Sequence, residues 1–182
     1  MTTRPLMLAL AIAATLLAGC KQQAASSPAA GEAAKLRTLG SLQFKPCSLA
    51  SPLPQGDPLE AQCTTLAVPE DRSQQGGRTI DLNIAWIPPR NTSDPAPDPV
   101  FFLAGGPGQA AVATFPALAP VFKDVMKDRG VVLVDQRGTG KSHPLNCKSA
   151  GSEQNGSDPA AARAWIEACI AELSPKADLR RY

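Results

Sequence analysis

The sequence predicts an α/β fold in which a parallel strand, helix and strand follow an antiparallel start of the sheet. Two apolar runs carry this prediction. Residues 100–103 end in Gly-Gly-Pro-Gly at 105–108, and residues 130–134 end in Asp-Gln-Arg-Gly at 135–138. Unbroken apolar runs of this kind are typical of strands buried on both faces. Residues 110–127 between them are long enough for a crossover helix, so the two strands are expected to be parallel.

Two stretches before this unit predict the antiparallel strands. Residues 63–69 form a short candidate strand that ends at Pro69. Residues 78–87 then alternate, with Ile80, Leu82, Ile84 and Trp86 on one side. Strict alternation is the pattern of a strand with one face in the core. The polar, proline-rich residues 88–99 are expected to connect this strand to the first parallel one.

A helix is expected after the second parallel strand. Asp158 is a candidate cap, Pro159 suits the first turn, and residues 160–173 follow. Apolar residues recur there at helical spacing, namely Trp165, Ile166, Cys169, Ile170 and Leu173. This combination of start signals and periodicity predicts a helix whose apolar residues pack against the rest of the domain.

The first twenty residues have the features of an export signal. Arg4 precedes an apolar stretch from Leu6 to Leu17, which is too short to span a membrane. Leu-Ala-Gly-Cys at 17–20 resembles a bacterial lipoprotein processing site, which implies that Cys20 is lipidated and becomes the mature N-terminus. We therefore expect an exported, membrane-anchored lipoprotein on the periplasmic side of the cell envelope.

The remaining chain divides into a flexible tether over residues 21–43 and one domain over residues 44–182. The tether is rich in Ala, Gln, Ser and Gly, a composition that buries too little apolar surface to fold. The chain has 182 residues and a formal net charge of +2. That length suits one domain, and the charge gives no basic surplus that would indicate a nucleic-acid partner.

The loop at 105–108 and the block at 131–142 together resemble the N-terminal part of an α/β-hydrolase. They are most similar to the proline iminopeptidase and tripeptidyl aminopeptidase group of serine exopeptidases. The resemblance implies that the backbone N–H of Gly106 forms part of the oxyanion hole, in a loop shaped by Gly105, Pro107 and Gly108. The residues alone leave the amides of Gly106, Gly108 and Gln109 as candidates, because Pro107 has no N–H to donate.

Four cysteines remain when Cys20 is set aside: Cys47, Cys63, Cys147 and Cys169. Export places them in an oxidising compartment, where disulfides are expected, and four cysteines allow three connectivities. The resemblance to the tripeptidyl aminopeptidase branch implies the local pairs, Cys47 with Cys63 and Cys147 with Cys169. The spacings are not those of a zinc site, and no metal or other cofactor is expected.

The octapeptide at 135–142 ends in Gly-Lys-Ser like a phosphate-binding loop. Asp135 stands where such a loop needs a glycine, and its carboxylate would repel a phosphate, so no nucleotide is expected. We expect Asp135 and Arg137 to fix loops near the active site. His143 is the only histidine, and the family's catalytic histidine comes late in the chain, so His143 is interpreted as a loop residue.

A nucleophile is missing from the sequence. No Gly-x-Ser-x-Gly motif occurs, since Ser142, Ser149 and Ser152 lack flanking glycines at that spacing. The resemblance covers residues 44–182 and corresponds to about the first third of a complete enzyme, truncated before the nucleophile strand. The expected function is the N-terminal portion of an aminopeptidase-type serine hydrolase acting on peptide substrates, inactive as this fragment. The fragment is expected to expose a sheet edge beside the second parallel strand.

Two alternatives remain open at this point. One is an esterase or an epoxide hydrolase on the same fold, because similar loops shape anion holes for several reactions. The other is a noncatalytic lipoprotein that serves as a binding module.

Overall fold

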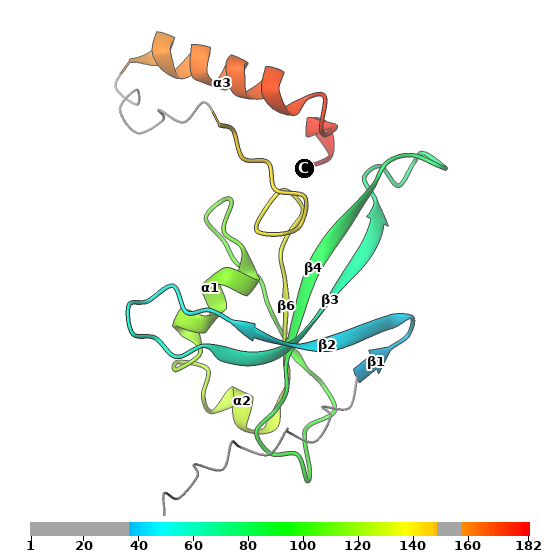
Figure 1. Ribbon diagram of the computed structural model, residues 1–182, viewed down its shortest axis with the longest axis vertical. Coiled ribbons are helices and arrows are strands. Elements are labelled where there is room, and N and C mark those ends of the chain that lie inside the picture. The colour runs from blue at the N-terminus through cyan, green and yellow to red at the C-terminus, as the bar shows by residue number, and fades with distance from the viewer. Residues whose placement is uncertain (1–36, 149–157) are drawn as a thin grey trace, which may run out of the picture. The chain divides into compact units, whose positions relative to one another are not determined.

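The computed structural model describes residues 37–148 and 158–182, and the described part contains one six-stranded sheet (Figure 1). Its strands are β1 (Arg37–Leu39), β2 (Leu42–Leu49), β3 (Leu59–Pro69), β4 (Thr79–Ile87), β5 (Val100–Phe102) and β6 (Val131–Val134). The helices are α1 (Ala111–Leu118), α2 (Val125–Asp128), α3 (Pro159–Leu173) and a 3-10 turn at Leu179–Arg181. The export signal, Cys20 and most of the expected tether lie outside the described residues.

The sheet is mixed, and its strand order is β1-β2-β3-β4-β6-β5. Strands β1 to β4 pair with their neighbours antiparallel, and β6 also runs antiparallel to β4. Strand β5 pairs parallel with β6, so that Phe102 lies opposite Leu133. An α/β fold with an antiparallel start and one parallel unit is therefore present, as the sequence predicts.

The sheet begins before residue 44. Strand β1 and the first residues of β2 form a hairpin within residues 37–43, which the sequence assigns to the tether. Gly40 closes this hairpin with a φ of 59°, a backbone conformation that glycine adopts without a steric penalty. The Arg37 guanidinium carbon lies 3.8 Å from the centroid of the Trp86 ring, a cation–π contact that attaches β1 to β4.

The crossover between β5 and β6 is not one helix. It contains α1 and the single turn of α2, with residues 119–124 between them. Pro120 explains the interruption, because it has no N–H with which to continue the helical hydrogen bonds after Ala119. Pro116 also lies inside α1 and removes one bond of that helix. The prediction of a crossover from 110 to 127 holds, but a continuous helix is wrong.

Strand β5 is not buried on both faces, contrary to the sequence prediction. It lies at an edge of the sheet, and Phe101 and the following Leu103 are 62% and 64% exposed, whereas Phe102 packs against Phe115 of α1. A run of apolar residues does not reveal whether other elements cover both faces of a strand. The sequence predicts an exposed sheet edge beside the second parallel strand, β6. That prediction is wrong, because β6 lies between β4 and β5, and the edge strand of the parallel pair is β5.

Strand β4 is buried more completely than its alternation predicts. Ile80 and Ile84 are buried on one face as expected, but Ala85 and Ile87 are buried on the other. The reason is its position between β3 and β6, where α1 packs across the sheet on the face that carries Ala85. Alternation therefore identified the strand and missed its second buried face.

The hydrophobic core lies between α1 and the sheet. Phe115 of α1 is fully buried, and its ring centroid is 5.1 Å from that of Phe102 and 5.3 Å from that of Phe122. Leu133 and Val131 of β6 lie in the same cluster. The Cys47–Cys63 disulfide joins β2 to β3 beside this core. By the chain-entropy argument, a loop of this size contributes about 3 kcal/mol to stability.

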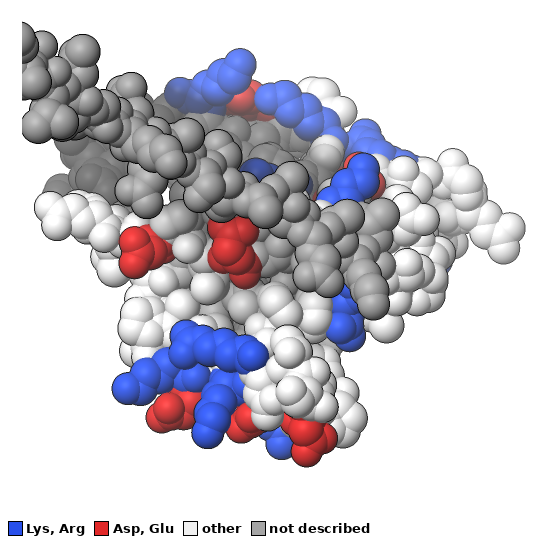
Figure 2. Space-filling view, turned by 60° about the horizontal axis from the view of Figure 1, so that its bottom comes forward, with Lys and Arg blue, Asp and Glu red and all other residues white. Residues whose placement is uncertain are grey.

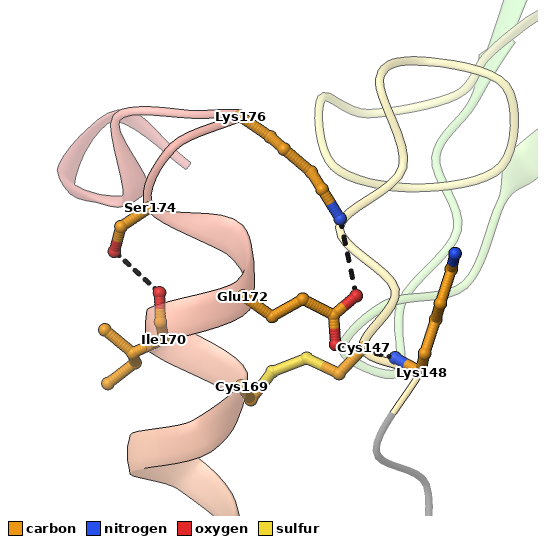
Figure 3. The surroundings of a disulfide bond; sticks show 7 residues. All are labelled: Cys147, Lys148, Cys169, Ile170, Glu172, Ser174 and Lys176. Atoms are coloured by element: carbon orange, nitrogen blue, oxygen red, sulfur yellow. Dashed lines mark hydrogen bonds and ion pairs between the residues drawn. A yellow bond between two sulfur atoms is a disulfide. The ribbon is translucent and has the colours of Figure 1, made fainter.

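Helix α3 begins as the sequence predicts. The Asp158 carboxylate caps it by accepting a hydrogen bond of 3.0 Å from the Ala160 N–H, and Pro159 occupies the first turn. The Cys147–Cys169 disulfide attaches the helix to the segment that follows β6 (Figure 3). Glu172 adds a second link by accepting from the Lys148 backbone N–H at 3.0 Å. Of its apolar residues, Leu173 is buried and Trp165 and Cys169 are half-buried, whereas Ile166 and Ile170 are exposed, so the expected packing is only partly present.

Replacing Phe115 with alanine is predicted to lower the free energy of unfolding by about 3–5 kcal/mol, because the substitution leaves a cavity under α1. Phe101→Ala is the matched control, since the Phe101 ring is mostly exposed, and we expect it to cost under about 1 kcal/mol. Urea denaturation of the disulfide-bonded chain measures both variants. Equal losses for the two phenylalanines would contradict this description of the core.

Candidate active site

The loop from Gly105 to Gln109 connects β5 to α1 and is exposed. Gly106 has a φ of 123° and Gly108 a φ of 91°, values that side-chain-bearing residues rarely adopt. The Gln109 N–H donates to the Gly105 carbonyl at 3.2 Å and closes the loop on itself. Of the three candidate amides, that of Gln109 is therefore already engaged.

The amides of Gly106 and Gly108 differ from that of Gln109. Within residues 37–148 and 158–182, neither donates a hydrogen bond to a backbone or side-chain acceptor. A Cβ at Gly106 would lie 3.2 Å from Gln109 Cγ and 3.3 Å from the Gly108 nitrogen, whereas a Cβ at Gly105 meets nothing within 4 Å. The loop thus needs glycine at 106 for its backbone conformation, and it leaves two N–H donors available.

Asp135 lies directly after β6 and holds the start of α1. Its side chain is only 1% exposed, and Oδ1 accepts from the Val112 N–H at 2.9 Å. Oδ2 accepts from Asn83 Nδ2 at 2.8 Å and from the Lys141 N–H at 3.2 Å. Ala110, the residue before α1, provides no side-chain cap. Asp135 therefore caps α1 from another strand and places its negative charge near the positive end of the helix dipole.

The turn at 138–142 encloses the Asp135 carboxylate. The Gly138 N–H donates to the Ser142 carbonyl, and a Cβ on Gly140 would lie 2.6 Å from the Ala110 Cβ. In a phosphate-binding loop the backbone N–H groups point at a bound phosphate. Here the Lys141 N–H points at the chain's own carboxylate.

Ser142 has a structural contact. It is fully buried, and its hydroxyl oxygen accepts from the Asn83 N–H at 2.8 Å. A serine that is closed off from solvent in this way cannot reach a substrate. Asn83 thus bonds to both Ser142 and Asp135, and it joins β4 to the turn after β6.

Arg137 connects β3 to the C-terminal segment. Its guanidinium donates to the Glu70 carbonyl at 3.0 Å and to the Arg181 carbonyl at 3.1 Å. His143 has a φ of 52°, and its ring Nε2 lies 3.2 Å from the Lys176 carbonyl oxygen. Both residues therefore contact the segment after α3, and in the described residues the ring of His143 forms its hydrogen bond with Lys176 and not with the loop at 105–108.

Glu70 is the center of a polar cluster that sequence reasoning missed. Its buried Oε1 accepts from the Asp178 N–H at 3.0 Å and from the Tyr182 hydroxyl at 3.1 Å, and Oε2 lies 3.6 Å from the Arg78 guanidinium. Asp178 and Tyr182 lie 108 and 112 residues from Glu70 in the chain. No local pattern in the sequence could have signalled these contacts.

The face shown in Figure 2 carries acidic and basic side chains side by side. Ion pairs within the described residues include that between Arg129 and Asp98. Within the two described ranges, no three His, Cys, Asp or Glu side chains are placed to hold a metal ion. No helix in those ranges is long and apolar enough to cross a membrane.

Comparison with known proteins gives a partial match to hydrolases. No protein-family model matches the chain. Carboxylesterase B from Mycobacterium tuberculosis, strains H37Rv and CDC 1551, is 34% identical over 92 residues, which is 49% of this chain and 17% of the relative. A Mycobacterium bovis protein named as a hydrolase matches to the same extent. A hydrolase is what this similarity supports. The match spans about a sixth of those relatives.

The Tyr182 hydroxyl gives a direct test of the polar cluster. Burial, and secondly the hydrogen bond to Glu70, raise the pKa of Tyr182 from 10.0 to about 12. The pKa of Tyr182 is higher in the folded chain than in the unfolded one. The contact of Tyr182 with Glu70 is therefore fully stabilising below pH 10 and weakens as the pH rises through about 12. Tyr182 is the only tyrosine, so an ultraviolet titration of tyrosinate reports this residue alone.

The substitution Glu70→Gln is predicted to lower that midpoint while leaving it above 10, since burial still acts on the phenol. Glu172→Gln, which removes a carboxylate bonded to Lys148 and Lys176, is the control and should leave the midpoint unchanged. A wild-type midpoint near 10 would show that Tyr182 does not dock on Glu70.

Proposed function

We propose that this chain is the N-terminal part of an exported serine hydrolase of the α/β-hydrolase fold, and that the Gly106 amide forms part of its oxyanion hole. The observation that carries the proposal is the pair of exposed glycine amides between β5 and α1, at positive φ and without an acceptor in the described residues. Enzymes of this fold take one oxyanion donor from the loop after their third strand. The partial similarity to mycobacterial hydrolases supports the same class.

The chemistry of the loop follows from its backbone. When a nucleophile attacks a carbonyl carbon, the oxygen gains negative charge, and an N–H held at hydrogen-bond distance stabilises that charge more than the starting carbonyl. The loop would bind the oxyanion, whereas Ser142 and Asp135 are occupied in structural contacts. We propose that the nucleophile, the acid and the general base come from residues beyond these 182.

The finer proposal is an aminopeptidase that removes residues from peptide N-termini, anchored to the periplasmic side of the envelope through lipidated Cys20. It is supported by the resemblance of the segments 105–108 and 131–142 to serine exopeptidases. The second candidate is a carboxyl ester hydrolase, which the names of the two Mycobacterium tuberculosis relatives favour. Both reactions pass through a tetrahedral oxyanion, so the same loop serves either one.

The test starts with the intact mass of the protein extracted from its native membrane. We expect a mass far above that of an acylated 21–182 chain, with Gly-x-Ser-x-Gly encoded soon after Tyr182. That full-length protein is then assayed with aminoacyl and tripeptidyl nitroanilides and with a nitrophenyl butyrate ester. Faster turnover of the anilides with a free amino end supports the aminopeptidase, and faster turnover of the ester supports the second candidate. A mass equal to that of the acylated 21–182 chain would contradict both the aminopeptidase and the ester hydrolase proposals.

In the full-length protein, Gly106→Ala is predicted to lower kcat by about 100-fold, with a much smaller change in KM. An alanine is strained at the φ of 123° that Gly106 adopts, so the backbone is expected to shift and move the N–H away from the developing charge. Gly105→Ala is the matched control, because its Cβ meets nothing within 4 Å, and it should keep kcat within about threefold. Equal kcat values for the two variants would remove Gly106 from the oxyanion hole.

A further inference from the structure

We propose that Asp135 is a positioning residue that sets the orientation of the Gly106 and Gly108 amides through its bond to α1. The inference rests on the proposed oxyanion role of that loop. Asp135 has no contact with the loop amides themselves; its carboxylate bonds to the Val112 N–H, in the first turn of α1. The loop leads directly into that turn, so the position of α1 fixes the position of the loop's C-terminal end.

Both ends of the loop are held by β6. At the start, Phe102 of β5 pairs with Leu133 of β6 in the parallel ladder. At the end, Val112 is bonded to Asp135, which lies two residues after Leu133 in the same chain segment. The Gly105 to Gln109 loop therefore spans two points that are fixed to one strand. Only the second point depends on a side chain.

The carboxylate is itself fixed in place. Asn83 from β4 and the Lys141 N–H both bond to Oδ2, and a Cβ on Gly140 would lie 2.3 Å from that oxygen. The turn at 138–142 is thus packed so closely that the carboxylate has no room to move away from α1. A helix cap alone needs one acceptor, whereas this arrangement holds the acceptor from three sides.

The positioning role predicts an effect on the loop that is separate from stability. Asp135→Asn keeps the shape of the side chain but provides one acceptor oxygen for three donors, so α1 loses its fixed place. In the 182-residue chain, we expect the nuclear magnetic resonance signals of the Gly106 and Gly108 amides to shift and their hydrogen exchange to change. In the full-length protein, kcat should fall by about 10- to 100-fold with KM within about threefold, because a small displacement of a catalytic group costs this much.

Ser142→Ala is the matched control. It removes the other buried bond to Asn83 and is expected to destabilise the chain, but it leaves the Asp135 to Val112 bond in place. The Gly106 and Gly108 signals should stay at their wild-type positions in this variant. If Ser142→Ala shifts those signals as much as Asp135→Asn does, the effect is general loosening and the positioning role is overturned.

A second pair of variants keeps the inference testable if Asp135→Asn does not fold. Gly140→Ala retains the carboxylate and displaces it, while Gly76→Ala adds a Cβ at a similar positive φ with nothing within 4 Å. Only Gly140→Ala should shift the Gly106 and Gly108 signals. Unshifted signals in a folded Asp135→Asn or Gly140→Ala chain overturn the positioning role. Shifted signals together with an unchanged kcat for Gly106→Ala would instead overturn the proposed oxyanion hole.

Discussion

The buried carboxylate of Asp135 is the contact at which the separate parts of this fold meet. It joins the end of β6 to β4 through Asn83, to α1 through the Val112 N–H and to the following turn through the Lys141 N–H. A hydrogen bond to a charged acceptor contributes about 1.5–3 kcal/mol, and losing its partners exposes a buried charge to an apolar interior. Loss of any one of the three donors would therefore weaken the contact, which adds to the strand pairing and core packing that hold β4, β6 and α1 together.

Elements whose signals are local in the chain could be predicted from the sequence. The cap of α3 is an example, because Asp158 and the Ala160 N–H are two residues apart and Pro159 lies between them. The burial of β5 is a counterexample, since the apolar residues Phe101 and Leu103 are the same whether or not another element covers their face of the sheet. Contacts such as that between Glu70 and Tyr182 depend on chain topology, and residue types alone do not encode them.

The candidate site divides in the same way. A glycine at 106 and at 108 is readable because the backbone there needs positive φ, and residue identity reports that need. The engagement of the Gln109 amide with Gly105 is not readable, because every residue except proline carries the same N–H. The Gly-Lys-Ser turn shows how one residue can resolve an ambiguous pattern: Gly140 packs against an internal carboxylate, and that carboxylate belongs to Asp135, which is readable in the sequence at the position where a phosphate-binding loop needs glycine.

The proposed oxyanion loop would constrain the type of reaction much more than the substrate. Amide and ester cleavage both develop negative charge on a carbonyl oxygen, and an N–H at the same point stabilises either one. Discrimination between an aminopeptidase and an esterase would come from groups that recognise a free amino end or an alcohol leaving group. Gly105, Gly106 and Gly108 of the loop carry no side chains and supply no such group. The names of the mycobacterial relatives and the resemblance to exopeptidases are for this reason both compatible with the proposed oxyanion role. Under that proposal the substrate would be set by groups that face the loop, and Asp135 would affect the rate without selecting the substrate.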